Sequence, residues 1–149
     1  MKVRVYTDGA SRGNPGSAAV GILIQDDNGN DIKTFRKYIG ECTNNVAEYS
    51  ALIESVKLLK ELNEPLEEII FFCDSELIVK QIRGEYKIRN KDLINLSLDF
   101  WKEIKSLNKK FSIRHIPREE NRTADKLANE ALDENKMNSV SADKSLLLD

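Results

Sequence analysis

The stretch Ile69-Ile70-Phe71-Phe72-Cys73-Asp74 contains five consecutive apolar residues and ends on a carboxylate. A short, continuous apolar run of this kind predicts a strand that is buried on both faces of a sheet. Ligands collect outside the carboxyl ends of such strands when neighbouring strands run parallel to them. The stretch therefore predicts a doubly buried strand, with Asp74 at the position where a ligand would bind.

The residues before this stretch predict an antiparallel start to the sheet. Strands are predicted over residues 3–7, 19–24 and 32–39, with a hairpin turn between the last two. Asp8 directly follows the first strand, as Asp74 follows its own. If these two strands are neighbours, the two carboxylates face each other.

Four helices are predicted from apolar stripes and capping residues. Asn45 is the predicted N-cap of the first helix, Ser75 of a short second one, Asn90 of a long third one and Thr123 of the last. A final strand is predicted over residues 111–116. This order predicts an α/β fold with a mixed five-stranded sheet, in which three antiparallel strands are followed by parallel additions and flanked by helices.

Length and composition fit one domain. The chain has 149 residues, of which 40% are hydrophobic and 32% charged, enough for one core. We predict a domain over residues 1–135 and a mobile tail over 136–149, with docking of the leucines at 146–148 as the alternative. No apolar run approaches the roughly 20 residues of a membrane-spanning helix.

The cysteines and the N-terminus favour an intracellular protein. Cys42 and Cys73 form no CxxC pair, and the N-terminus lacks the apolar region of a secretory signal. We therefore expect a cytoplasmic monomer with no membrane partner.

Charge is distributed unevenly along a chain whose net charge is −2. Residues 80–126 carry 13 basic and 7 acidic residues, whereas the remainder carries 10 basic and 18 acidic ones. This asymmetry suggests a surface for a polyanion. A lysine-rich, solvated helix face is the alternative interpretation.

Four acidic residues stand out by position: Asp8, Glu48, Asp74 and Asp125. Gathered at one point they would repel one another, unless hard divalent cations such as Mg²⁺ bind between them. Each also has an ordinary interpretation. Glu48 fits a capping box with Asn45, Asp125 suits a helix N-terminus, and the other two suit the ends of strands.

The strings around these acids resemble the type 1 ribonuclease H family. They are Asp8-Gly9-Ala10-Ser11-Arg12-Gly13-Asn14-Pro15-Gly16, Thr43-Asn44-Asn45-Val46-Ala47-Glu48, Asp74-Ser75 and Asn121-Arg122-Thr123-Ala124-Asp125. Their order and rough spacing agree with the family over about residues 1–133.

The resemblance implies an endonuclease that hydrolyses the RNA strand of RNA–DNA hybrids with two Mg²⁺ or Mn²⁺ ions. It implies that Asp8 bridges both ions, that Glu48 and Asp74 hold the ion near the leaving 3′ oxygen, and that Asp125 helps to hold the other. Products would end in 5′-phosphate and 3′-hydroxyl. The implied substrate contacts are Asn14, Asn44, Asn45 and Ser75.

Two departures from the family pattern bear on function. The basic protrusion that many members carry between the two middle helices is absent, so substrate affinity would depend on Lys87, Arg89 and Lys91 or on a partner, unless these are plain surface charges. The family's mobile histidine also has no clear counterpart, because His115 lies in a predicted strand. Arg118 is the candidate to reach the scissile phosphate, and a surface ion pair is its alternative.

Two other functions fit parts of the sequence. A non-catalytic nucleic-acid-binding domain would explain the missing protrusion, but such a domain has no need of all four acids. A phosphoacceptor domain with a phosphorylated Asp8 or Asp74 would need successive parallel β/α units, which the antiparallel start opposes.

Overall fold

A computed structural model describes the backbone of residues 1–148 and the side chains of residues 1–140. The predicted order of strands and helices is confirmed, with one added 3₁₀ turn, η1, before the last helix. The elements are β1 (Lys2–Gly13), β2 (Gly16–Asp26), β3 (Asp31–Cys42), α1 (Asn44–Lys60), β4 (Glu68–Cys73), α2 (Glu76–Ile82), α3 (Lys91–Leu107), β5 (Lys110–His115), η1 (Arg118–Glu120) and α4 (Arg122–Leu148).

The sheet is mixed and five-stranded, as predicted, in the order β3-β2-β1-β4-β5. The β1–β2 and β2–β3 pairs are antiparallel, whereas β1–β4 and β4–β5 are parallel. β1 is longer than predicted because it keeps pairing with β2 as far as Gly13, well after its pairing with β4 ends at Thr7. β1 and β4 are thus neighbours, which is the condition for their two aspartates to meet.

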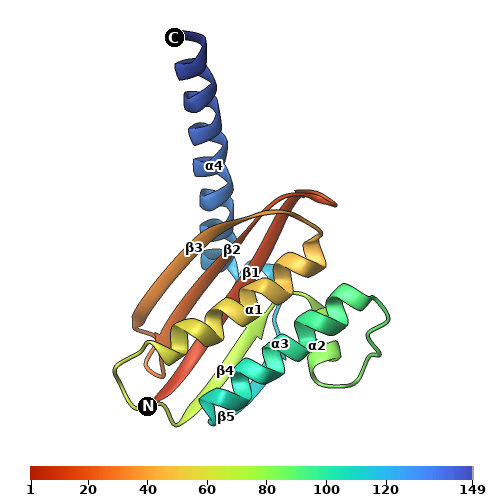
Figure 1. The fold of residues 1–149 in the computed structure, drawn as a ribbon. Coiled ribbons are helices and arrows are strands. Elements are labelled where there is room, and N and C mark those ends of the chain that lie inside the picture. Colours follow the sequence, from red (N-terminus) through yellow and green to blue (C-terminus); the bar gives the residue numbers. More distant parts are fainter. Residues whose placement is uncertain (149) are drawn as a thin grey trace.

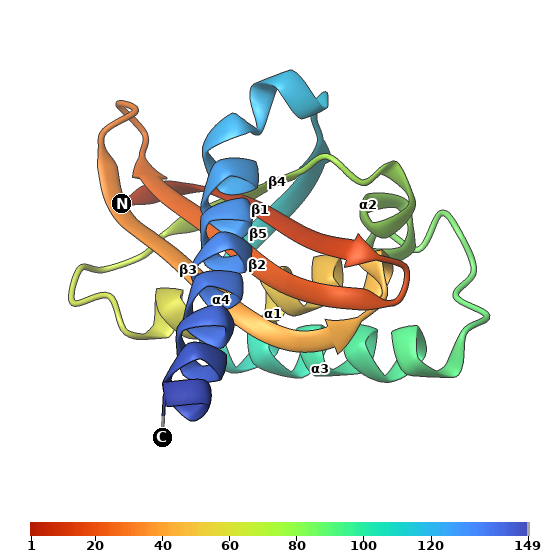
Figure 2. The same cartoon turned by 90° about the horizontal axis from the view of Figure 1, so that it is seen from above.

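Helices cover the two faces of the sheet unequally. α1 and α3 pack on one face, and α4 crosses the other face over β1, β2 and β3 (Figures 1 and 2). Ile69, Phe71 and Cys73 of β4 are therefore fully buried, but Ile70 and Phe72 on the opposite face are only half-buried. The prediction that this strand is buried on both faces is wrong for the face on which α4 packs, because α4 covers β1, β2 and β3 there but not β4.

Two predicted helix caps are confirmed and two are wrong. Ser75 and Asn90 accept hydrogen bonds from the third residue beyond them, as N-caps do. For α1 the cap is Thr43, not Asn45, because the Thr43 hydroxyl accepts from the Val46 amide. For α4 the helix begins at Arg122, which places Thr123 inside the first turn.

α4 continues beyond the sheet. It runs as far as Leu148 and projects away from the rest of the fold (Figure 1), so the segment predicted as a tail from residue 136 is helical up to that point. Docking of the leucines at 146–148 concerns side chains outside the described ones. Within the described residues, no helix is long and apolar enough to cross a membrane.

Candidate active site

The parallel ladder between β1 and β4 positions the first two acids. Thr7 and Cys73 are the last paired residues of this ladder, and Asp8 and Asp74 follow them directly. Carboxylate oxygens of Asp8, Glu48 and Asp74 all lie within 4.8 Å of one another. The two strand-end acids therefore meet, as expected if their strands are neighbours.

A glycine allows Glu48 to join them from α1. A Cβ atom on Gly9 would lie 2.2 Å from the backbone carbonyl carbon of Ala47 and 2.4 Å from the amide nitrogen of Glu48. Only a residue without a side chain lets the backbone of α1 approach β1 this closely. The alternative of a capping box between Glu48 and Asn45 is wrong, because the N-cap of α1 is Thr43.

A second glycine brings α4 and Asp125 to the opposite face of the sheet. Gly21 pairs with Asp8 across β1 and β2, and a Cβ atom on Gly21 would lie 2.0 Å from the carbonyl oxygen of Ala124. The first turn of α4 is thereby held close to Asp8. Asp125 lines the same cavity of about 490 Å³ as Asp8, Glu48 and Asp74.

The three clustered acids carry an electrostatic penalty. Burial, together with the carboxylates of Glu48 and Asp74, raises the pKa of Asp8 far above its usual range, and burial with Asp74 raises the pKa of Glu48. Within residues 1–140, the only salt bridge to any of the four acids joins Arg118 Nη2 and Asp125 Oδ1, at 3.6 Å. A buried set of carboxylate oxygens that lacks basic partners fits hard divalent cations such as Mg²⁺ or Mn²⁺.

Asn121 ties three parts of the site together, a role that its place in the sequence did not reveal. Its side chain is 1% exposed, and its Nδ2 group donates to the Thr7 carbonyl at 2.8 Å and to Asp74 Oδ2 at 3.2 Å. It lies immediately before α4, which carries Asp125. Asn121 therefore fixes one carboxylate and anchors the start of the helix that supplies another.

Cys73, interpreted from sequence as a core residue, is buried and also touches the site. Its thiol lies 3.6 Å from Glu48 Oε2, within donating distance. His115 is the last residue of β5, as its strand interpretation requires, and its Nε2 atom is 3.3 Å from the Asp74 carbonyl. Arg118 is 80% exposed on η1 and lines the acid cavity, and its partner is Asp125, not the glutamates beside it.

Of the four predicted substrate residues, Asn14, Asn44, Asn45 and Ser75, only Asn44 lines the acid cavity. Its amide donates to Asn14 Oδ1 at 3.0 Å, which links the β1–β2 turn to the start of α1. Asn45 is half-buried in the first turn of α1, and Ser75 caps α2. A short segment, residues 83–90, joins α2 to α3 in place of a protrusion. Lys87, Arg89 and Lys91 are exposed on or beside this segment.

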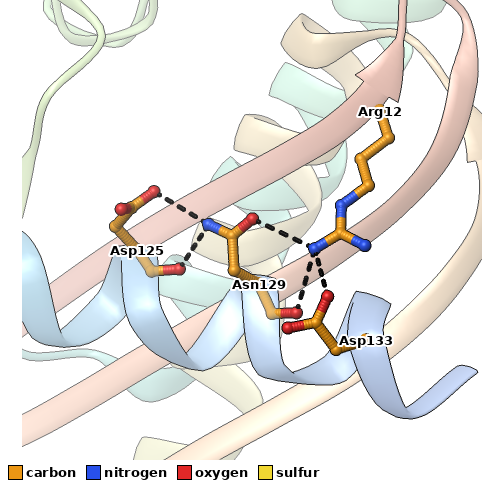
Figure 3. A network of polar contacts seen from close by, with 4 residues as sticks. All are labelled: Arg12, Asp125, Asn129 and Asp133. Atoms are coloured by element: carbon orange, nitrogen blue, oxygen red, sulfur yellow. Dashed lines mark hydrogen bonds and ion pairs between the residues drawn. The ribbon is translucent and has the colours of Figure 1, made fainter.

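Sequence reasoning also missed a polar network at the end of the cavity. Asn129 of α4 contacts Asp125, and Arg12 of β1 contacts Asn129 and Asp133 (Figure 3). Asn129 is four residues after Asp125, which places both on one face of a helix and is a weak signal. Arg12 is 117 residues away from Asn129 in the sequence, so only the fold brings these two residues together.

Known proteins share this fold and much of the sequence. Residues 6–131 match the family described as reverse transcriptase-like. Ribonuclease HI of Halobacterium salinarum is 39% identical over 133 residues, which cover 89% of this chain and 65% of that protein. Ribonuclease H of Clostridium botulinum is 34% identical over 151 residues, which cover 89% of this chain and 97% of that protein.

Solved structures of similar proteins share this fold. The crystal structure of LC11-RNase H1 in complex with an RNA/DNA hybrid superimposes with a TM-score of 0.81 at 40% identity, covering 89% of this chain and 98% of that one. Some relatives are longer: this chain spans 65% of the Halobacterium protein and 36% of a bifunctional protein from Mycobacterium tuberculosis. Fold, motifs and identity together show that the chain belongs to the ribonuclease H family, in the type 1 form that lacks the basic protrusion.

Proposed function

We propose that this protein is an endonuclease that hydrolyses the RNA strand of RNA–DNA hybrids. The observation that carries the proposal is the gathering of Asp8, Glu48 and Asp74 within 4.8 Å, with Asp125 on the same cavity. Membership of a family with relatives named ribonuclease H supports it, as does a structural neighbour bound to an RNA/DNA hybrid. A pure binding domain would have no use for a buried, mutually repelling set of acids.

The proposed chemistry uses two divalent cations, Mg²⁺ or Mn²⁺. Bound between the acids, such ions would activate a water molecule and stabilise the leaving oxygen of a phosphodiester. Following the family pattern, Asp8 would contribute to both positions. Glu48 and Asp74 would contribute to the one near the leaving 3′ oxygen, and Asp125 to the other. The expected products carry 5′-phosphate and 3′-hydroxyl ends.

The remaining residues bind and orient the duplex. Arg118 projects a guanidinium beside the cavity, where it would contact a non-bridging phosphate oxygen or the departing product. The amides of Asn14, Asn44 and Asn45, with the Ser75 hydroxyl, would contact the substrate. Amide and hydroxyl groups of this kind are suited to recognising the 2′-hydroxyl that distinguishes RNA from DNA.

The protein is proposed to act as a cytoplasmic monomer with no membrane partner. Cys42 and Cys73 are both free, as expected in a reducing compartment, and no described helix is suited to crossing a membrane. Analytical ultracentrifugation of the purified chain would test whether it is a monomer in solution.

The deciding experiment incubates the purified protein with a hybrid duplex whose RNA strand is end-labelled. Matched RNA–RNA and DNA–DNA duplexes serve as substrate controls, in Mg²⁺, in Mn²⁺ and in chelator. We expect metal-dependent cutting of the hybrid RNA alone, lost in Asp74→Asn. Tight binding of the hybrid with no cutting in either metal would contradict the proposal and favour a binding domain.

A further inference from the structure

Asp125 differs from the other three acids in how it is held. It is absent from the cluster within 4.8 Å and lies in the first turn of α4, with its side chain 31% exposed. Asp8 and Asp74 are fixed by paired strands, and Glu48 by tight contact between α1 and β1. The close approach at Gly21 holds the backbone of α4 in the same way, but it does not fix the half-exposed side chain of Asp125, so the direction of this carboxylate depends on the groups that bond to it.

Asn129, one helical turn further along α4, supplies one such bond and a second one to the Asp125 backbone. Its Nδ2 group donates to Asp125 Oδ1 at 3.2 Å and to the Asp125 carbonyl at 3.0 Å. The carboxylate is thereby held from the side of α4, while Arg118 approaches the same oxygen from η1 at 3.6 Å. Asn129 itself lines the cavity.

An amide can present either end to a neighbour, and Arg12 selects the end. Its Nη2 group lies 3.5 Å from Asn129 Oδ1 and 3.4 Å from the Asn129 carbonyl, and it pairs with Asp133 Oδ1 at 2.6 Å (Figure 3). A guanidinium has only donors, so the amide end that faces it must be the oxygen. The amide nitrogen then faces Asp125. Without Arg12 the Asn129 amide is held only through its nitrogen, so its oxygen has lost the contact that fixes the position of the amide against Asp125.

We propose that Arg12 and Asn129 are positioning residues that orient the Asp125 carboxylate for cation binding. The chain of contacts runs from Asp133, through Arg12 and the Asn129 amide, to Asp125. It connects the far end of β1 with the acid that lies outside the 4.8 Å cluster. The inference rests on the proposed function, because it concerns the metal-binding role of Asp125.

A second arginine provides the matched control. Arg36 of β3 pairs with Glu130 Oε2 at 2.7 Å and with Glu134, so it also ties the sheet to α4. Among the described side chains, Arg36 contacts none of the four acids and does not contact Asn129. If Arg12 only fastened the helix, Arg12→Ala and Arg36→Ala would have the same effects.

The first test titrates Mn²⁺ calorimetrically into the substrate-free protein. Loss of a group that orients a metal ligand weakens metal affinity by about 10- to 100-fold. We expect Asn129→Ala and Arg12→Ala to weaken one class of Mn²⁺ site by about tenfold, and Arg12→Lys to retain part of the affinity. Arg36→Ala should match the wild type. Asn129→Asp, which keeps the shape but replaces the donor by a charge, should be worse than Asn129→Ala.

The second test is a double-mutant cycle. If Asn129 acts through Asp125, then Asn129→Ala should have no further effect on Mn²⁺ affinity in an Asp125→Ala background, whereas independent effects would add. Equal effects of Arg12→Ala and Arg36→Ala, or additivity in this cycle, would overturn the inference. If the wild type binds Mn²⁺ but does not cut hybrid, the proposed function is refuted. The inference about Arg12 and Asn129 is then decided by the Mn²⁺ affinities alone.

Discussion

Asp8 and Asp74 are neighbours because each is the next residue after the last pair of the parallel ladder, Thr7 and Cys73. Backbone hydrogen bonds of two strands thus hold two like charges together. Replacing one carboxylate by an amide should leave this ladder intact while removing a proposed metal ligand. The shape of the site and its charge can therefore be separated by mutation.

We expect Asp8→Asn and Asp74→Asn each to lower the rate of hybrid hydrolysis by orders of magnitude. Asp99→Asn, at an exposed position of α3, is the control and should keep wild-type activity. Circular dichroism would verify that all three variants are folded. A loss smaller than about tenfold, or 1.4 kcal/mol in activation free energy, for either site variant would contradict its role.

The free energy of unfolding of the metal-free protein should fall as pH rises. The pKa values of Asp8 and Glu48 are raised in the folded state, so that state binds more protons than the unfolded chain above about pH 4. The free energy of unfolding must then decrease with increasing pH until the folded-state carboxyls ionise. Thermal unfolding in chelator between pH 5 and 8 would measure this slope.

The same experiment with Asp8→Asn should give a flatter slope and a higher Tm at pH 8, because repulsion is reduced. Adding Mg²⁺ should raise the Tm of the wild type more than that of the variant. A wild-type Tm that rises steadily from pH 5 to 8 in chelator would show that the cluster is not destabilising.

The close approach at Gly21 should make it intolerant of a methyl group. A Cβ atom there would lie 2.0 Å from the Ala124 carbonyl oxygen, so Gly21→Ala must push α4 away from the sheet. We expect a loss of about 2 kcal/mol or more in urea unfolding, with reduced Mn²⁺ affinity. Gly40→Ala is the control: its φ of +87° is unfavourable, but no atom lies within 4 Å, so it should cost about 1 kcal/mol. Equal losses would show that α4 adjusts freely.

Arg118→Ala should reduce kcat/KM on hybrid by about tenfold, corresponding to ~1.4 kcal/mol, because a cation beside the reacting phosphate is lost. Arg118→Lys should recover part of the activity, since it keeps the charge without the planar donor set. Arg114→Ala, which alters an exposed arginine of β5, should have little effect. Initial-rate measurements on all three variants would decide, and wild-type kinetics for Arg118→Ala would remove Arg118 from the site.

Removing residues 138–149 should leave a folded, active domain. Among the described side chains of α4, the last buried one is Leu132, and those from 138 to 140 are exposed. We expect a Tm within a few degrees of the full chain and unchanged cutting of hybrid. Loss of folding on truncation would assign a structural role to the distal turns.

Much of the fold was predictable because the signals are local. The apolar run ending at Asp74, the alternating first strand ending before Asp8, and the caps at Ser75 and Asn90 each depend on a few adjacent residues. The N-cap of α1 was less predictable. Thr43 stands only two residues before Asn45, both are good capping residues, and only the backbone geometry decides between them.

The supporting shell of the site was not predictable for a different reason. Asn121, Arg12 and Asn129 act through contacts that join elements distant in sequence. The requirement for glycine at Gly9 and Gly21 likewise arises from helix backbones that pack against the sheet. Such roles depend on tertiary distances, which composition and periodicity do not contain.

The projecting part of α4 has a mechanical consequence for the site. The helix has 27 residues, which at 1.5 Å per residue makes a rod of about 40 Å, and its first turn carries Asp125. A sideways load on the outer turns would act on this rod as on a lever. The pairs Arg12–Asp133 and Arg36–Glu130 fasten the rod to the sheet between its outer turns and Asp125, so they resist the passage of such a load to the acid cavity.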